Sequence, residues 1–171
     1  MVSTPVYKTS LHQMASAQEF MHDVLNNVYP ELFTQINSIV SAIELIQTDH
    51  SNSLLVPLAK KISNEMDGLY SMEKEVLFPF ITTLAADNQK SESCKLFKDT
   101  KVHYTAMLRY INELKICLTI CNSQDCSPAV LSAIKESVAV FEQQIIFLQV
   151  TKDKYLFAQF KSCSGCKAIV S

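Results

Sequence analysis

The chain has 171 residues, 48% of them hydrophobic and 9% aromatic, enough for one domain with a buried core. Only 2 glycines and 5 prolines occur, and this shortage of turn-forming residues favours a few long helices over an all-β fold. The formal net charge is −2, and the sequence shows no basic stripe. We therefore expect neither a nucleic-acid partner nor a polybasic membrane contact.

The N-terminal stretch Met1–Lys8 lacks the apolar core of a signal peptide, and no apolar run approaches the roughly 20 residues of a membrane span. These features predict a cytoplasmic protein without a membrane segment. The chain contains 6 cysteines, and without a secretion signal we expect most of them to be reduced thiols.

Helical spacing predicts a first helix from about residue 10 to residue 47, followed by a polar loop over 48–53. Pro30 falls inside this helix and should kink or divide it, because proline lacks an N–H group. The predicted inward face consists of His22, Leu25, Tyr29, Leu32, Ile36, Ile39, Val40, Ile43 and Ile46.

The second helix is predicted over 54–86, with Pro57 tolerated in its first turn. Gly68 lies in its interior and permits close approach of a neighbouring side chain. Glu73 is set into the apolar stripe, and a carboxylate buried alone is costly, so it needs a partner. The predicted stripe consists of Ile62, Met66, Leu69, Glu73, Val76 and Phe80.

A loop over 87–93 and a third helix over 94–121 are predicted next, and a turn over 122–126 follows. The apolar spacing of the third helix favours a particular inward face. That face consists of Val102, His103, Ala106, Met107, Tyr110, Leu114 and Cys117.

Ser127 and Pro128 form a typical helix start, with serine as the cap and proline in the first position. The fourth helix should face inward with Ile134, Val138, Phe141, Ile145, Leu148, Lys152, Tyr155 and Gln159. Four amphipathic helices with short connections predict an all-α, up-down-up-down four-helix bundle. We expect one domain over 1–171, with its core at about 10–160 and a flexible tail over 161–171.

Four polar residues lie on the predicted inward faces, one on each helix: His22, Glu73, His103 and Lys152. Any one of them alone is an ordinary core residue satisfied by local hydrogen bonds. Together they predict a polar centre in the bundle core, the place where bundles hold metals and cofactors. The tyrosines at helical spacing are expected to pack at the edges of the core.

Two stretches carry a family resemblance: Met21-His22-Asp23-Val24-Leu25-Asn26-Asn27-Val28-Tyr29-Pro30-Glu31-Leu32 and Met72-Glu73-Lys74-Glu75-Val76-Leu77-Phe78-Pro79. They resemble the hemerythrin-like family of HHE cation-binding domains, most closely in pattern its di-iron iron-centre repair proteins. The resemblance implies a four-helix bundle that holds two irons by histidine and carboxylate ligands. His22 then matches the first-helix histidine, Glu73 the bridging carboxylate and His103 the third-helix histidine.

The remaining ligand positions implied by the resemblance are occupied by Ile43, Leu69, Leu148 and Lys152, so a di-iron site cannot be assembled. We hypothesise a buried Glu73–Lys152 ion pair in place of the metals, with His22 and His103 as hydrogen-bonding neighbours. The protein is then a non-enzymatic interaction or regulatory module with no cofactor and a protein partner. Neither the partner's identity nor the oligomeric state leaves a signal in the sequence.

An alternative keeps one metal. His22, Glu73 and His103 form a two-histidine, one-carboxylate set suited to a single iron or zinc ion. On the family resemblance, such a protein handles or senses oxygen, nitric oxide or iron.

A third hypothesis concerns the thiols. Cys163 and Cys166 have the spacing of redox and metal sites, and Cys94 at the start of the third helix is their best-placed partner. Cys117 and Cys121 are one turn apart, but they should lie at the opposite end of the bundle. Free thiols in a flexible tail are the other interpretation.

Overall fold

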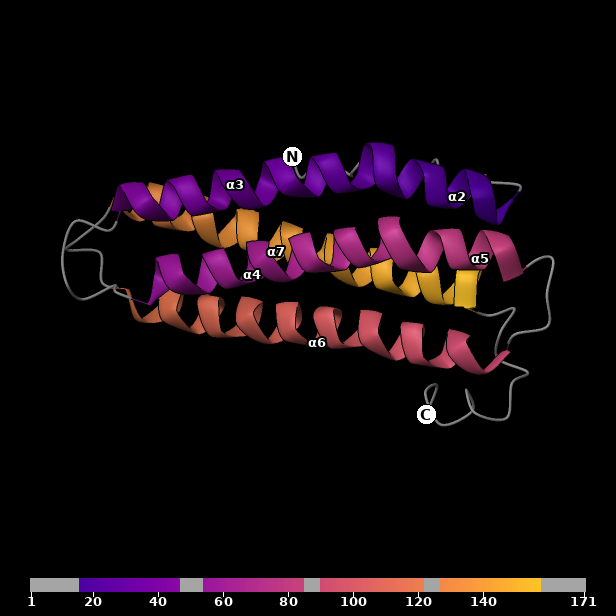
Figure 1. Cartoon of the computed structure of the whole chain (residues 1–171). Helices are drawn as coiled ribbons and strands as arrows, with labels where there is room; N and C mark the ends of the chain where they lie inside the picture. The colour runs from indigo at the N-terminus through magenta and orange to yellow at the C-terminus, as the bar shows by residue number, and fades with distance from the viewer. Residues whose placement is uncertain (1–15, 47–53, 85–89, 122–126, 158–171) are drawn as a thin grey trace.

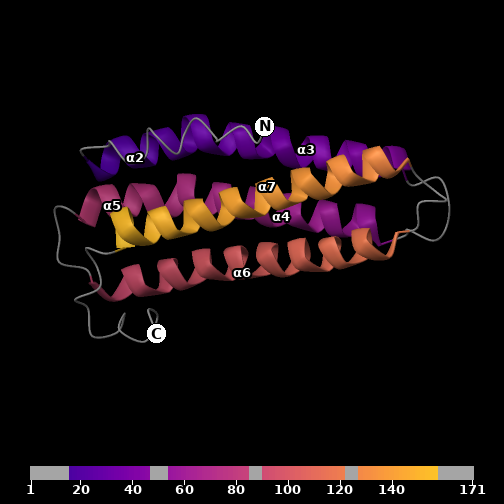
Figure 2. The same cartoon turned by 180° about the vertical axis from the view of Figure 1, so that it is seen from behind.

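The computed structural model describes residues 16–46, 54–84, 90–121 and 127–157, with the side chains of 84 and 90–95 excepted. Within these ranges every element is helical and none is a strand. The described elements form four long helical segments, separated by the stretches that are not described. These segments lie side by side in both views (Figures 1 and 2). No described helix is both long and apolar enough to cross a membrane.

The first helical segment comprises α2 (Ala17–Asp23), a π-helical turn η1 (Val24–Val28) and α3 (Tyr29–Ile46). Ser16 begins it with a capping box, because its hydroxyl accepts from the Glu19 N–H and the Glu19 carboxylate accepts from the Ser16 N–H, both at 3.2 Å. The predicted start near residue 10 lies outside the described residues. At Pro30 we predicted a kink or a division, and the structure has a π-turn that ends two residues before this proline.

The second helical segment comprises α4 (Leu55–Met72), η3 (Glu73–Leu77) and α5 (Phe78–Leu84). Pro57 lies in the first turn of α4, as predicted. A proline again follows the π-turn, since Pro79 comes two residues after η3 ends.

The third segment, α6 (Lys90–Ile120), begins earlier than predicted, so the loop predicted over 87–93 is wrong for 90–93. These four residues lack an apolar period, but they contain no glycine or proline and can therefore form the first turn of a helix. The fourth segment comprises α7 (Pro128–Lys152) and η4 (Asp153–Phe157). Ser127 and Pro128 begin α7 as predicted, although the serine side chain makes no capping hydrogen bond.

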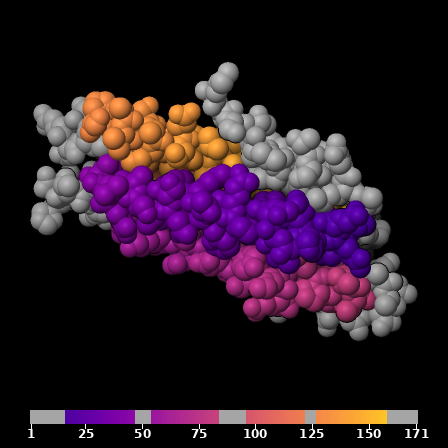
Figure 3. Space-filling view, turned by 90° about the horizontal axis from the view of Figure 1, so that it is seen from above, coloured from indigo at the N-terminus to yellow at the C-terminus, as the bar shows by residue number. Residues whose placement is uncertain are grey.

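The segments pack so that α3 contacts α4 and α7, and α6 also contacts α4 and α7. Figure 3 shows the first segment lying between α7 and the second segment on one face of the molecule. The colour gradient in Figure 1 runs in opposite directions along successive long helices. The fold is therefore an all-helical bundle with its core on the line where the four segments face one another.

The predicted inward face is confirmed on α7 as far as Lys152, whereas on α6 it is confirmed for Met107 and Leu114 and wrong for Val102. On α6 the sequence favoured Val102 and His103, but Val102 is 64% exposed. Apolar residues lie on both sides of this helix, so the pattern alone does not decide which side is inward. Among the side chains of α6 that the structure describes, the buried ones are Phe97, Thr100, Tyr104, Met107, Ile111, Leu114 and Leu118.

Candidate polar centre between the four helices

An ion pair lies in the middle of the bundle. The Nζ atom of Lys152, at the end of α7, is 2.5 Å from Oε2 of Glu73, at the start of η3. Both side chains are 0% exposed. Charged groups are almost never buried without partners of this kind. These are the two residues that the sequence analysis paired.

Two tyrosines complete the centre, and they come from the other two helical segments. The hydroxyl of Tyr29 donates to Oε2 of Glu73 at 2.8 Å and accepts from Lys152 at 3.2 Å. The hydroxyl of Tyr104 accepts from Lys152 at 2.9 Å. All four helical segments therefore contribute one side chain to a single buried network.

The donors of the ammonium group are fully used. A lysine ammonium carries three N–H bonds, and Lys152 has three acceptors, which are Glu73 and the two tyrosine hydroxyls. The ammonium also lies 4.9 Å from the ring centroid of Tyr29 and 5.5 Å from that of Tyr104, within reach of their π-systems. On the carboxylate, Oε1 has no hydrogen-bond partner.

Burial shifts the ionisation of the groups around the pair. It lowers the pKa of the Lys152 ammonium, and the neighbouring Glu73 charge opposes that shift. Burial together with the Glu73 charge raises the pKa of both Tyr29 and Tyr104 well above 10.0. Both phenols are therefore protonated at neutral pH and available as hydrogen-bond donors.

Three of the four segments change to π-helix at this centre. Tyr29 directly follows η1, Glu73 begins η3, and Lys152 directly precedes η4. The backbone hydrogen bonds show the widened turns. The N–H of Tyr29 donates to the carbonyl of Val24, and the N–H of Phe78 donates to the carbonyl of Glu73, so each bond spans five residues where an α-helix spans four. π-turns are rare and occur frequently at functional sites. Only Tyr104 lies on an uninterrupted α-helix.

The π-turns explain several errors of the sequence analysis, because each adds one residue to a turn and moves the inward positions along by one. Beyond Glu73 the sequence placed Val76 inward, whereas Val76 is 45% exposed and Leu77 is buried. Beyond Lys152 it placed Tyr155 inward, whereas the wholly buried residue is Leu156.

The same effect moves His22 out of the core. Its predicted inward position, counted back from Tyr29 at α-helical spacing, is wrong because the count crosses η1; His22 is exposed and Asp23 is buried. Oδ1 of Asp23 accepts from Nδ2 of Asn27, and its Oδ2 has no partner. His22 instead borders a surface groove beside Lys74.

His103 also lies outside the centre, contrary to the prediction. Its Nδ1 is 2.8 Å from Oε2 of Glu65 on α4, and the two side chains are 30% and 27% exposed. Gly68 makes room for this contact, because a Cβ there would lie 2.9 Å from Cε1 of His103. The residue that enters the core is the next one, Tyr104.

The residues present do not fit a two-iron centre. The positions where the resemblance implied further ligands hold Ile43, Leu69 and Leu148, all buried hydrocarbon. The ammonium of Lys152 occupies the remaining position and uses Glu73 as its own acceptor. The structure does not bring the three residues of the single-metal alternative together, since His22 is exposed and His103 pairs with Glu65 instead of lying beside Glu73. No group of three His, Cys, Asp or Glu able to hold a metal ion occurs among the described residues.

Most of the thiol hypothesis lies outside the described residues. Cys163 and Cys166 belong to the part of the chain that is not described, and so does the side chain of Cys94. Cys117 and Cys121 are half-buried, and Cys117 forms no disulfide.

The sequence analysis missed the roles of Tyr29 and Tyr104. One signal for Tyr29 was available, because a buried lysine must find acceptors and Tyr29 shared the inward stripe of its helix. Comparisons with protein-family models, curated proteins and solved structures found no match to the chain. The family resemblance therefore rests on the two sequence stretches that carry it.

Proposed function

We propose that the protein is a hemerythrin-like, up-down-up-down four-helix bundle in which a lysine–glutamate ion pair replaces a two-metal centre. On this proposal it acts without a cofactor, as a non-enzymatic interaction or regulatory module in the cytoplasm. The observation that carries the proposal is the position of the Lys152 ammonium, in contact with side chains from each of the other three helical segments, namely Tyr29, Glu73 and Tyr104.

The charge of the ammonium supports this interpretation. A carboxylate in the core of a bundle needs a cation, and metal ions are the usual cations in such cores. Lys152 supplies a positive charge to Oε2 of Glu73 at 2.5 Å. The phenols of Tyr29 and Tyr104 complete the shell around it with oxygen atoms.

The three π-turns give independent support. A π-turn interrupts the regular hydrogen bonding of a helix, and a purely structural bundle has no need of one on three of its segments. Each of the three π-turns either contains a residue of the polar centre or directly adjoins one. We infer that the helices keep the backbone geometry of an ancestral ligand site after its ligands were replaced.

Because the polar centre is buried, we expect the protein to act through its surface. Tyr29, Glu73 and Lys152 are 0% exposed and Tyr104 is 2% exposed, so a substrate has no direct contact with these groups. The polar centre then fixes how the four segments pack, and partner recognition depends on their outward faces.

Elemental analysis tests the proposal. Protein produced in medium supplemented with iron, zinc and manganese, and purified without chelators, should contain none of these metals in stoichiometric amount. A stoichiometric metal that is lost on Glu73→Gln, and retained in the exposed neighbour Glu75→Gln, would contradict it.

A further inference from the structure

A groove of about 310 Å³ lies between the first and second helical segments. One wall comes from α2 and η1 and the other from η3 and α5, which lie at the same end of the bundle (Figures 1 and 2). Each wall extends over about two helical turns, or about 11 Å. The described residues that line the groove are Gln18, Met21, His22, Leu25, Lys74, Phe78, Pro79 and Thr82.

A π-turn shapes each wall. His22 lies just before η1, and Lys74 lies within η3. The same two turns bring Tyr29 and Glu73 into the core and leave His22 and Lys74 exposed. The groove is therefore the outer side of the turns that form the polar centre, and regular α-helical spacing does not reveal it.

Each wall contributes one side chain with an available nitrogen. Within the part of the chain that the structure describes, the His22 ring makes no hydrogen bond or ion pair, and the Lys74 ammonium contacts only the Tyr70 ring, 5.3 Å from its centroid. An ammonium is a cation, and an imidazole carries at least one N–H donor in either protonation state. None of the described lining residues is acidic. Both nitrogens can therefore donate to an anion in the groove.

The groove also offers an apolar surface. Leu25 on η1 is half-buried and Pro79 on α5 is exposed. Met21 and Phe78 add apolar atoms to the walls but are 5% and 4% exposed, so they belong to the core. Small-molecule sites enclose most of their ligand, whereas an open groove between two helices is typical of a docking site for a segment of another protein.

We propose that this groove docks a short acidic segment of a partner protein, in which a large apolar side chain lies close to a carboxylate. The inference rests on the proposed interaction role and names the chemistry of the partner. The carboxylate accepts hydrogen bonds from Lys74 and His22, and the apolar side chain packs against Leu25 and Pro79. Charge complementarity favours such a segment over a basic one.

Selection from a phage-displayed library of random dodecapeptides tests this, with the full chain as bait at low salt. The enriched peptides should carry aspartate or glutamate within four positions of a large apolar residue. Fluorescein-labelled synthetic copies of these peptides are then titrated with the chain and its variants. Lys74→Glu should lose about tenfold in affinity, and His22→Ala should weaken binding as well. Both side chains are exposed, so neither variant should melt below the wild-type chain.

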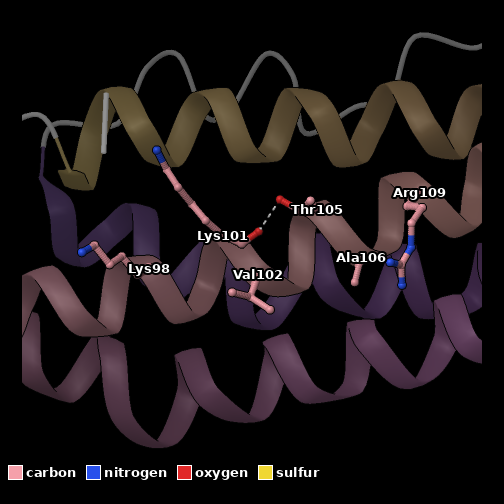
Figure 4. Close-up of a pocket in the computed structure, with 6 residues that line it drawn as sticks. All are labelled: Lys98, Lys101, Val102, Thr105, Ala106 and Arg109. Atoms are coloured by element: carbon pink, nitrogen blue, oxygen red, sulfur yellow. Dashed lines mark hydrogen bonds between the residues drawn. The ribbon is translucent and has the colours of Figure 1, made fainter. Parts of the chain in front are cut away.

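The matched control is Lys98→Glu, which makes the same change in net charge at an exposed lysine on α6. Lys98 borders a different hollow, shown in Figure 4. This variant should bind the selected peptides within about twofold of the wild-type chain.

Equal or larger losses in Lys98→Glu than in Lys74→Glu would show attraction by net charge or by the other hollow, and would overturn the proposal. So would enrichment of basic or purely apolar peptides, no enrichment, or tighter binding of the chain to phosphatidylserine vesicles than to the selected peptides. None of these outcomes alters the metal content, so docking and the metal-free centre fail separately.

Discussion

Lys152 and Glu73 are 79 positions apart in the sequence and 2.5 Å apart in the bundle core. A buried ion pair does not necessarily stabilise a fold, because removing both charges from water costs about as much as their attraction returns. Breaking such a pair on one side is different, since the remaining charge stays buried without a partner. The centre should therefore be more sensitive to single substitutions than to paired ones.

Lys152→Ala should lower the free energy of unfolding by about 3–5 kcal/mol, because Glu73 is left uncompensated. Urea denaturation measures the change, and Lys154→Ala is the control, since Lys154 is exposed two residues away. Lys152→Met also leaves Glu73 without its partner and should lower the free energy of unfolding. Adding Glu73→Gln to Lys152→Met should restore part of that loss, because the buried charge is then removed. If Lys152→Ala is as stable as the wild-type chain, the claim that Glu73 needs Lys152 as a partner in this core is wrong.

The helical bundle could be predicted from the sequence because four apolar stripes and the Ser127–Pro128 start are local signals. The pairing of Glu73 with Lys152 could be reached because both lay on predicted inward stripes and the family resemblance placed them opposite each other. The π-turns could not be predicted from the sequence, because one extra residue in a turn changes neither the composition nor the capping signals of a helix. His22 was misplaced for that reason.

Alkaline titration should separate the tyrosines of the centre from the others. Raised pKa values of Tyr29 and Tyr104 stabilise the fold fully below pH 10.0, and this contribution is lost as the pH rises toward their folded-state values. In a tyrosinate absorbance titration these two of the 6 tyrosines should ionise last, with unfolding. The Tyr29→Phe/Tyr104→Phe variant should lack this late component, and its persistence there would assign it to other residues.

Gly68→Ala tests the contact between α4 and His103. Alanine is favoured over glycine in a helix interior by about 1 kcal/mol, but its Cβ would displace the His103 ring, which lies 2.9 Å from the ideal Cβ position. We expect the gain of about 1 kcal/mol only when His103→Ala is already present. In the wild-type background the gain should be smaller or reversed, because displacement breaks the bond to Glu65. Equal effects in both backgrounds, measured by urea denaturation, would mean that the ring yields without cost.

Lys152→Glu examines whether the lysine holds the place of a metal. The substitution puts a second carboxylate beside Glu73, with the phenols of Tyr29 and Tyr104 already adjacent. Two close carboxylates in a dry core require either protons or a cation, so the metal-free variant should melt well below the wild-type chain. An all-oxygen donor set favours hard cations, and added manganese or iron should raise the melting temperature of the variant.

The wild-type chain should not respond, since its ammonium already neutralises Glu73. Lys152→Gln removes the charge without adding a carboxylate and is the matched control. If no added metal changes the melting temperature of Lys152→Glu, the idea that Lys152 stands in the place of a metal is wrong. The ion pair of the wild-type chain is then a structural feature without a connection to a metal centre.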